Sequence, residues 1–243
     1  MKSIKYFTLC ISSLLLLIIS LKSHAQSGYL NKRGIISYNA MVAPNLNSLI
    51  YTQVPFIGDK FIWKHQFNTD YIYSNKSVVG ASVGYYYSKP SYNAELKDLN
   101  PQRIIINEYS FSLYLKFYGL FKTSAYAPIG DYFKIGLSQS LMNINDRSGF
   151  LESNQASSGY VPSGNPVQGT ASGIGLLASY GSSRVINDKF VLDFGIEMNF
   201  IPNIMTSTKG ITFVSTAKAD RVNTYATTSG LFLFRVSFGK LVL

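Results

Sequence analysis

Apolar and polar residues alternate one by one over long stretches of this chain. In the segment 107–118, for example, Ser112 stands between Phe111 and Leu113, and the alternation continues toward both ends of the segment. Successive side chains of a β-strand point to opposite faces, so this period of two predicts a strand with one apolar and one polar face. The same pattern recurs in 61–74, 189–200 and 229–240.

Eight segments share this pattern, and we expect each of them to form a strand. They are 34–43, 61–74, 77–88, 107–118, 131–142, 171–183, 189–200 and 229–240. Each has about 10 to 14 residues, close to the 9–11 that a tilted strand needs to cross a bilayer. No segment of useful length shows a helical period, and the sequence therefore predicts an all-β fold.

The composition of the two faces indicates which of them points inward. The polar faces consist largely of small or hydrogen-bonding residues: Ser82, Gly84, Ser110, Ser112, Gly136, Ser138, Gly175 and Ser179. The apolar faces carry aromatic residues near the strand ends: Trp63, Tyr85, Tyr87, Tyr109 and Phe200 at one end, and Tyr71, Tyr73, Phe117, Phe133, Phe190 and Phe238 at the other. Two aromatic girdles around an apolar band are typical of a membrane-spanning barrel with a polar lumen. The alternative is a soluble, lipocalin-like barrel with the faces reversed.

The lengths of the connections support an up-and-down barrel. Long connections (44–60, 89–106, 143–170 and 201–228) alternate with shorter ones (75–76, 119–130 and 184–188). Outer-membrane barrels have long external loops and short periplasmic turns, so both termini are expected in the periplasm. The fold class we predict is an eight-stranded antiparallel up-and-down transmembrane β-barrel, porin-like in its general construction.

A family resemblance adds to this prediction. It rests on the overall pattern, on the Tyr126-Ala127-Pro128-Ile129-Gly130 turn that leads into Asp131-Tyr132-Phe133, and on the phenylalanine-rich final strand. In these features the chain resembles the small eight-stranded outer-membrane barrels, OmpX-like and opacity-like, and especially the Bacteroidetes-type outer membrane protein β-barrel domain, PorT-like barrels included. The resemblance implies a place in the Gram-negative outer membrane and contact with its lipid and its assembly machinery. Many such barrels end on an aromatic residue, whereas Phe238 here lies five residues before Leu243.

The first 25 residues have the form of a cleaved signal peptide. Lys2 and Lys5 precede the apolar run 6–21, and Ser23 and Ala25 are the small residues that signal peptidase reads. An uncleaved membrane anchor is the alternative, but a run of about 16 residues is short for a span. Residues 26–243 would then form a single domain. Cleavage removes Cys10, the only cysteine, and so excludes disulfides, thiolate catalysis and cysteine-bound zinc from the mature protein.

The charge of the mature chain is modestly basic. The formal net charge of +10 falls to about +7 because three lysines and no acids leave with residues 1–25. No dense run of Lys and Arg is present, and we expect no nucleic-acid partner. We also expect no cofactor and no metal, because a single histidine in the mature chain cannot build a histidine-rich metal site.

Eight charged residues are expected in the lumen. They are the cations Lys64, Lys116, Lys134 and Arg235 and the anions Asp70, Glu108, Asp193 and Glu197. The lumen of an eight-stranded barrel is filled by side chains, and buried charges must be paired, so we interpret this balanced set as a structural charge network. Asp193 is expected to pair with Arg235, and Asp70 with Lys116 or Lys134. A path for protons or a solute is the alternative.

Catalytic candidates are few. His65 is expected on the outward face, beside Trp63 and Phe67 and near the outer membrane interface. Its structural interpretation is an amphipathic interfacial side chain. A lipid-modifying enzyme of the outer leaflet would use the same location and would need a serine or acid beside His65.

The long connections are where surface function is expected. The segment 201–228 carries Lys209, Lys218 and Arg221 against Asp220 alone. This excess of cations fits contact with lipopolysaccharide phosphates or an acidic partner, and equally fits a solvated loop. The function we predict is non-enzymatic: an envelope-structural or surface-interacting barrel with a plugged polar lumen. The alternatives are the lipid-modifying enzyme and a barrel for narrow transport or an accessory role in secretion.

Overall fold

The computed structural model describes residues 32–44, 61–88, 91–92, 102–120, 126–146, 154–156, 159–161, 167–207 and 232–242. The expected signal peptide lies outside the described residues, as do Lys209, Lys218 and Arg221. Among the described residues, no helix is long and apolar enough to span a membrane.

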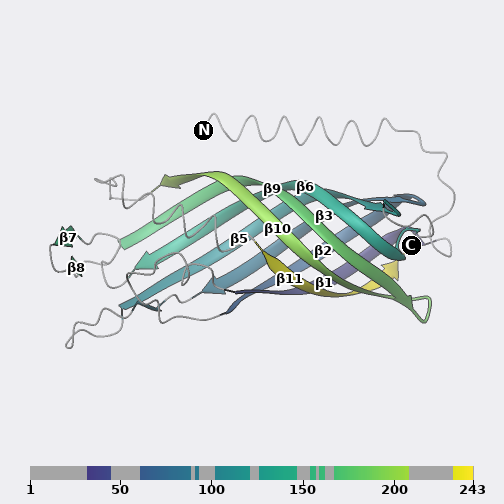
Figure 1. Cartoon of the computed structure of the whole chain (residues 1–243), viewed down its shortest axis with the longest axis horizontal. Coiled ribbons are helices and arrows are strands. Elements are labelled where there is room, and N and C mark those ends of the chain that lie inside the picture. Colours follow the sequence, from purple (N-terminus) through teal and green to yellow (C-terminus); the bar gives the residue numbers. More distant parts are fainter. Residues whose placement is uncertain are drawn as a thin grey trace.

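Eight long strands wind around one axis with a common tilt (Figure 1). They are β1 (Gly34–Pro44), β2 (Phe61–Ser74), β3 (Ser77–Ser88), β5 (Gln102–Tyr118), β6 (Gly130–Asp146), β9 (Val167–Ile186), β10 (Phe190–Ser207) and β11 (Leu233–Val242). Three short strands lie at the end where the long connections leave the barrel: β4 (Ser91–Tyr92), β7 (Asn154–Ala156) and β8 (Gly159–Val161). We call this end the loop end and the opposite one the turn end.

The strands form a closed antiparallel ring. Their order is β3-β2-β1-β11-β10-β9-β6-β5, and pairing of β3 with β5 closes the circle. The first and last strands meet in a continuous register from Gly34 opposite Val242 to Val42 opposite Phe234. Closure gives each of the eight long strands a paired neighbour on both sides, which is the condition for a sheet to reside in a hydrocarbon environment. The predicted eight-stranded barrel is confirmed.

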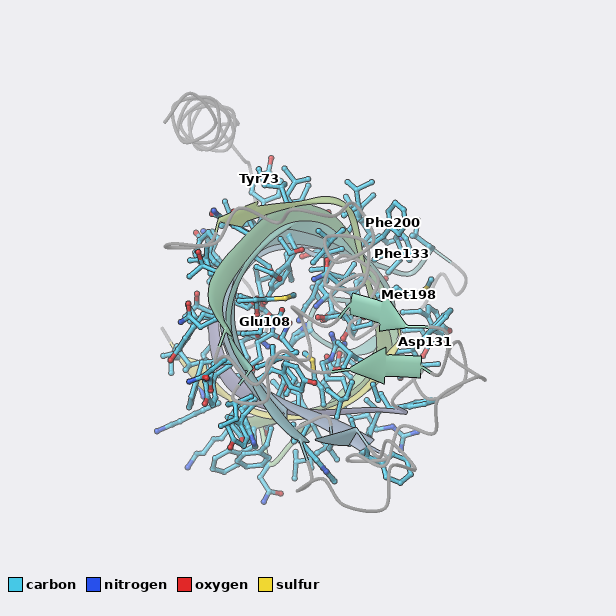
Figure 2. The ribbon with its side chains drawn as sticks, turned by 90° about the vertical axis from the view of Figure 1, so that its left-hand side faces the viewer. Tyr73, Glu108, Asp131, Phe133, Met198 and Phe200 are labelled. Atoms are coloured by element: carbon cyan, nitrogen blue, oxygen red, sulfur yellow. The ribbon has the colours of Figure 1, made fainter. Side chains whose placement is uncertain are left out.

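Burial alternates along each strand with the parity expected from the sequence. Phe67 is 64% exposed on the outside of β2, whereas Lys134 of β6 and Arg235 of β11 are 1% and 3% exposed on the inside. Seen along the axis, the ring has Glu108 on its inner side and Phe200 on its outer side (Figure 2). The apolar face is therefore the outer one. The lipocalin-like alternative, which requires an apolar interior and a polar exterior, is wrong.

Several predicted strand bounds need correction at the loop end. Residues 102–106, 143–146, 167–170 and 201–207 were expected in connections but belong to strands. Their pairing continues the register of the barrel: Ile104 of β5 lies opposite Asp146 of β6, and Asp146 in turn lies opposite Val167 of β9. These extensions lack the strict alternation of the central band, which is why the pattern alone ends too early. β11 begins at Leu233 instead of 229, also at the loop end, whereas at the turn end 184–186 extend β9, 241–242 extend β11, and Lys189 lies in the turn.

The turns explain how the strands reverse at the turn end. Asn187 and Asp188 join β9 to β10 with φ of 51° and 55°, the left-handed conformation that Asn and Asp adopt more readily than other residues with a side chain. The described end of the connection between β5 and β6, residues 126–129, packs against the turn end of the barrel. There the Ala127 N–H donates to the Asn75 carbonyl at 2.6 Å, and the Ser183 hydroxyl donates to the Pro128 carbonyl at 2.5 Å. Ala127 and Pro128 are buried as a result.

Candidate functional site

All eight charged residues expected in the lumen lie inside the barrel. They are buried side chains of five strands: Lys64 and Asp70 of β2, Glu108 and Lys116 of β5, Lys134 of β6, Asp193 and Glu197 of β10, and Arg235 of β11. The inward parity of these strands brings the residues together, although they are up to about 170 positions apart in the chain. Four cations face four anions, so the formal charges of this set balance.

Arg235 is the centre of the first group of contacts. Its guanidinium binds Asp193 at 3.0 Å and Glu197 at 3.1 Å, both on the neighbouring strand β10. Lys134 of β6, which is separated from β10 only by β9, also pairs with Glu197. The Tyr132 hydroxyl donates to the Asp193 carboxylate at 2.6 Å and accepts a hydrogen bond from Arg235. Every charge in this group has an opposite charge in direct contact, which buried charges require.

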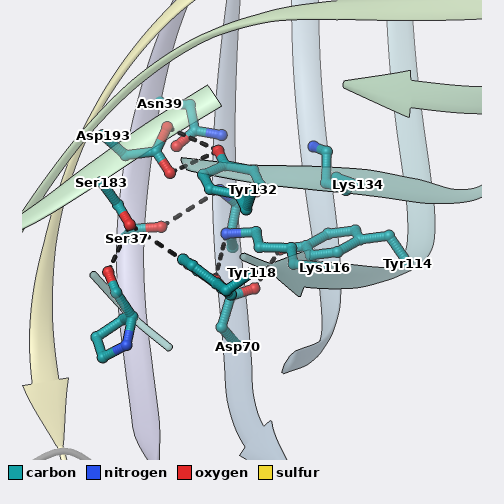
Figure 3. Close-up of polar contacts among 12 residues, drawn as sticks. Ser37, Asn39, Asp70, Tyr114, Lys116, Tyr118, Tyr132, Lys134, Ser183 and Asp193 are labelled. Carbon is teal, nitrogen blue, oxygen red and sulfur yellow. Dashed lines mark hydrogen bonds and ion pairs between the residues drawn. The ribbon is translucent and has the colours of Figure 1, made fainter. Parts of the chain in front are cut away.

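Asp70 is the centre of a second group, closer to the turn end. The Lys116 ammonium lies 2.6 Å from one Asp70 oxygen, and the Tyr114 hydroxyl donates to the other oxygen at 2.6 Å (Figure 3). Lys116 also lies 5.1 Å from the centre of the Tyr132 ring, and Lys134 lies 4.7 Å from the centre of the Tyr114 ring. These cation–π contacts join the two groups into one network. Of the two partners expected for Asp70, the structure places Lys116 beside it.

A looser part of the network lies toward the loop end. Lys64 and Glu108 are 3.7 Å apart, and the Ser140 hydroxyl donates to Glu108 at 2.9 Å. Beside them, the Asn39 amide donates to Gln66 at 2.9 Å, and the Gln66 amide donates to Ser82 at 2.7 Å. The buried side chains thus form hydrogen bonds across β1, β2 and β3 as well as within the charged set.

Apolar side chains lie at both ends of this polar region. At the turn end, Ile35, Ile72, Val78, Tyr118, Ala127, Tyr132, Val191 and Leu241 form one buried cluster. At the loop end, Met41, Ala43, Ile62, Tyr86 and Leu233 form another. We call them the turn-end cap and the loop-end cap. The interior is therefore layered, with the charged network between two apolar layers.

Tyr114 and Tyr132 were not among the residues singled out from the sequence. Both are inward residues by parity, two positions from Lys116 and Lys134 respectively, and this spacing is the signal that could have identified them. Glycines make room for them. A Cβ on Gly181 would lie 2.7 Å from the Tyr132 hydroxyl, and a Cβ on Gly136 would lie 2.7 Å from the Tyr114 Cβ. Glycines opposite these tyrosines on the neighbouring strands thus leave room for the large polar side chains of the lumen.

His65 lies on the outward face, where the sequence placed it. Its Nδ1 is hydrogen-bonded to the Tyr38 hydroxyl at 2.5 Å, and the two rings stack with their centres 6.0 Å apart. The described residues contain no group of three or more His, Cys, Asp and Glu side chains that could hold a metal ion. On the outer wall, the imidazole is thus hydrogen-bonded to the phenolic hydroxyl of Tyr38.

Comparison with known proteins identifies similar structures but no related sequences. The sequence matches no family model and no curated protein. The outer membrane protein OprG of Pseudomonas aeruginosa is similar in structure over 89% of this chain and 97% of its own, with 10% identity and a TM-score of 0.49. The attachment invasion locus protein Ail of Yersinia pestis matches over 86% and 96%, with 10% identity and a TM-score of 0.40. CarO of Acinetobacter baumannii matches over 88% and 100%, with 12% identity and a TM-score of 0.40.

The class of protein follows from the barrel itself. A closed ring of eight antiparallel strands, an apolar outer wall and a charged interior define a transmembrane β-barrel of the outer-membrane type. The closed ring of eight strands confirms the barrel that the sequence and its family resemblance predicted. The PorT-like detail of that resemblance stays a prediction.

Proposed function

We propose that this chain is a non-enzymatic outer-membrane protein with a plugged lumen, which contributes to envelope structure or surface interaction through its long loops. In this proposal residues 1–25 are removed on export and both termini lie in the periplasm. The observation that supports it most directly is the network around Arg235 and Asp70, whose buried members come from five strands and bind one another inside the barrel.

The energetics of the network favour a plug over a path. A solute that crossed the lumen would have to separate paired charges, and breaking a buried ion pair costs about 3–5 kcal/mol. It would also have to pass the turn-end and the loop-end caps, which offer apolar side chains in place of water. An interior of this kind also links strands that are not paired in the sheet, such as β2 with β5 and β6 with β10.

The loops are the part of the protein that we assign to surface interaction. Lys209, Lys218 and Arg221 lie between β10 and β11, in a connection that leaves the barrel at the loop end. We propose that these cations meet lipopolysaccharide phosphates or an acidic partner outside the cell. Replacement of all three by Gln should weaken retention of the barrel on immobilised lipopolysaccharide. Unchanged retention would exclude these residues from the contact.

A conductance experiment tests the plugged lumen. The barrel is purified in detergent, its folded state is verified by faster migration on an unheated gel, and it is inserted into planar bilayers. We expect no regular conductance steps from the wild type. A double substitution of Arg235 and Glu197 by Ser, which removes the centre of the network, should raise the frequency of current events. Regular ohmic steps from the wild type would overturn the plug and favour the transport alternative, whereas a stable complex recovered by pulldown would favour the secretion-accessory one.

A further inference from the structure

The turn end of the barrel carries an uneven distribution of charge. Six cations and two acids lie there among the described residues: Lys32, Arg33, Lys76, Arg184, Lys189, Lys240, Asp131 and Asp188. Four of the cations, Lys32, Arg184, Lys189 and Lys240, lie around the wall formed by β9, β10 and β11, whereas the Arg33 guanidinium donates to the Tyr71 hydroxyl of β2 at 3.4 Å. Asp188 is the one acid among the described turn-end residues of this wall. We call these four cations the basic sector.

Strand register places Arg184 and Lys240 on the two strands that flank the start of β10. Lys240 lies opposite Phe190 of β10 on one side and Ile36 of β1 on the other. Arg184 lies opposite Leu192 of β10. Since neighbouring strands are about 4.8 Å apart and two residues of a strand span about 6.6 Å, Arg184 and Lys240 are roughly 12 Å apart along the wall.

The two remaining members of the sector are held at the same place by hydrogen bonds. The Lys189 carbonyl accepts the Leu241 N–H at 2.8 Å, which fixes the β9–β10 turn against the end of β11. The Lys32 ammonium donates to the Asp188 carbonyl at 3.2 Å and so approaches this turn from the chain preceding β1. The four cations are thus brought to one site by three separate segments.

The cations of the sector point away from the lumen. Arg184 and Lys240 are exposed, whereas their chain neighbours Ser183 and Leu241 are buried on the inner side. Lys189 is exposed at the tip of the turn. Within a strand this parity directs a side chain outward, so the charged ends of Arg184 and Lys240 leave the barrel wall.

An apolar surface adjoins the sector on the side of the membrane. Phe190 and Phe238 stack there with ring centres 5.3 Å apart, and Phe238 is 55% exposed. Ile36 is also exposed beside Lys240. Cations just beyond an aromatic girdle lie at the depth of lipid headgroups, and their aliphatic stems extend along the apolar wall.

We propose that the basic sector binds one anionic glycerophospholipid of the leaflet at the turn end. The lipid phosphate would lie among Arg184, Lys189 and Lys240, with an acyl chain along Phe190 and Phe238. Arg provides paired N–H donors that suit phosphate, and the lysines add positive charge. The inference rests on the membrane placement of the proposed function and adds a ligand at the opposite end from the loops.

Two features distinguish this site from a general attraction to negative charge. The stacked phenylalanines require a ligand with a hydrocarbon chain, which free phosphate lacks. Among the described turn-end residues of the opposite wall, Lys76 in the β2–β3 turn is balanced by Asp131 at the start of β6. Lys76 is exposed and therefore provides a matched control.

The test is native mass spectrometry of the folded full barrel in detergent with equal amounts of phosphatidylglycerol and phosphatidylethanolamine. We expect phosphatidylglycerol to be retained preferentially. Each cation removed near an anionic surface should weaken retention about fivefold, so Lys189→Gln with Lys240→Gln should reduce it roughly 25-fold. Lys76→Gln should leave it unchanged, and soluble glycerol phosphate should not displace the lipid.

Other outcomes overturn the proposal. Equal retention of the two lipids, an equal loss in Lys76→Gln, or displacement by glycerol phosphate would each exclude a lipid site at the basic sector. Every variant is first verified by its shift on an unheated gel. If the wild type shows no such shift, the proposal of a membrane barrel is itself wrong. If the shift is present and lipid selectivity is absent, only the lipid site fails.

Discussion

Asp193 and Arg235 lie on the neighbouring strands β10 and β11, and their carboxylate and guanidinium groups meet at 3.0 Å inside the barrel. The Tyr132 hydroxyl joins them from β6, on another part of the wall. This contact combines an ion pair between adjacent strands with hydrogen bonds to a strand that is paired with neither of them. The same combination recurs around Glu197, which binds Arg235 of the adjacent strand and Lys134 of β6.

Removal of Arg235 should strongly destabilise the barrel. Arg235→Ala leaves the carboxylates of Asp193 and Glu197 buried without their shared cation, and we expect the free energy of unfolding to fall by about 3–5 kcal/mol. Urea unfolding in lipid vesicles measures this change. Lys76→Gln, in the exposed turn between β2 and β3, should change the free energy by less than about 0.5 kcal/mol. Equal effects of the two substitutions would contradict a central role for Arg235.

The Tyr132 hydroxyl has an effect that can be separated from its ring. Tyr132→Phe keeps the packing in the turn-end cap but removes the hydrogen bonds to Asp193 and Arg235. Because these bonds involve charged groups, we expect a loss of about 1.5–3 kcal/mol in the free energy of unfolding. The control is Tyr109→Phe on the outer wall, which should be close to neutral. A neutral Tyr132→Phe would show that the ring alone matters.

The turn between β9 and β10 should respond to backbone preference. Asn187 has a φ of 51°, and a β-branched residue there is strained by about 1–2 kcal/mol. Asn187→Ile should therefore lower the free energy of unfolding by that amount, whereas Asn187→Gly should preserve it. Both are measured by urea unfolding in vesicles. Equal stability of the two variants would mean that the turn relaxes to another conformation.

Trp63 reports on the outward face. It is the only tryptophan in the chain and is 58% exposed in the loop-end girdle. In vesicles its fluorescence should be quenched more by lipids brominated near the headgroup than by lipids brominated near the centre of the bilayer, because aromatic girdles lie at the interface. Trp63→Phe supplies the background signal. Absence of quenching by either lipid would place this face outside the membrane.

His65 distinguishes the structural interpretation from the enzymatic one. Its Nδ1 is engaged by the Tyr38 hydroxyl, and we expect His65→Ala to leave the acyl composition of outer-leaflet lipid unchanged. Mass spectrometry of lipid A from cells that express either form measures this composition. The control is Tyr38→Phe, which frees Nδ1 but keeps the imidazole. A change in acyl content that disappears only in His65→Ala would establish a lipid-modifying activity.

The sequence by itself determined the strands, their faces and the class of barrel. Side-chain direction in a strand has a period of two, so parity alone assigned Lys134 and Arg235 to the interior and Phe67 to the exterior. The girdle residues Trp63 and Phe238 indicated that the apolar face points outward. Local patterns carry this information because each face of a strand meets a single environment, either the lumen or the surroundings of the barrel.

Only the tertiary structure decided which residues meet inside. The sequence left Lys116 and Lys134 open as partners of Asp70, and the curvature of the closed ring brings Lys116 to 2.6 Å. The same curvature brings Tyr132 to Asp193, a contact between β6 and β10, which are not paired. The burial of Ala127 in the turn-end cap is likewise not predicted by any periodic pattern in the sequence. Contacts across the lumen depend on register, tilt and closure together, and these are properties of the whole barrel that no single strand encodes.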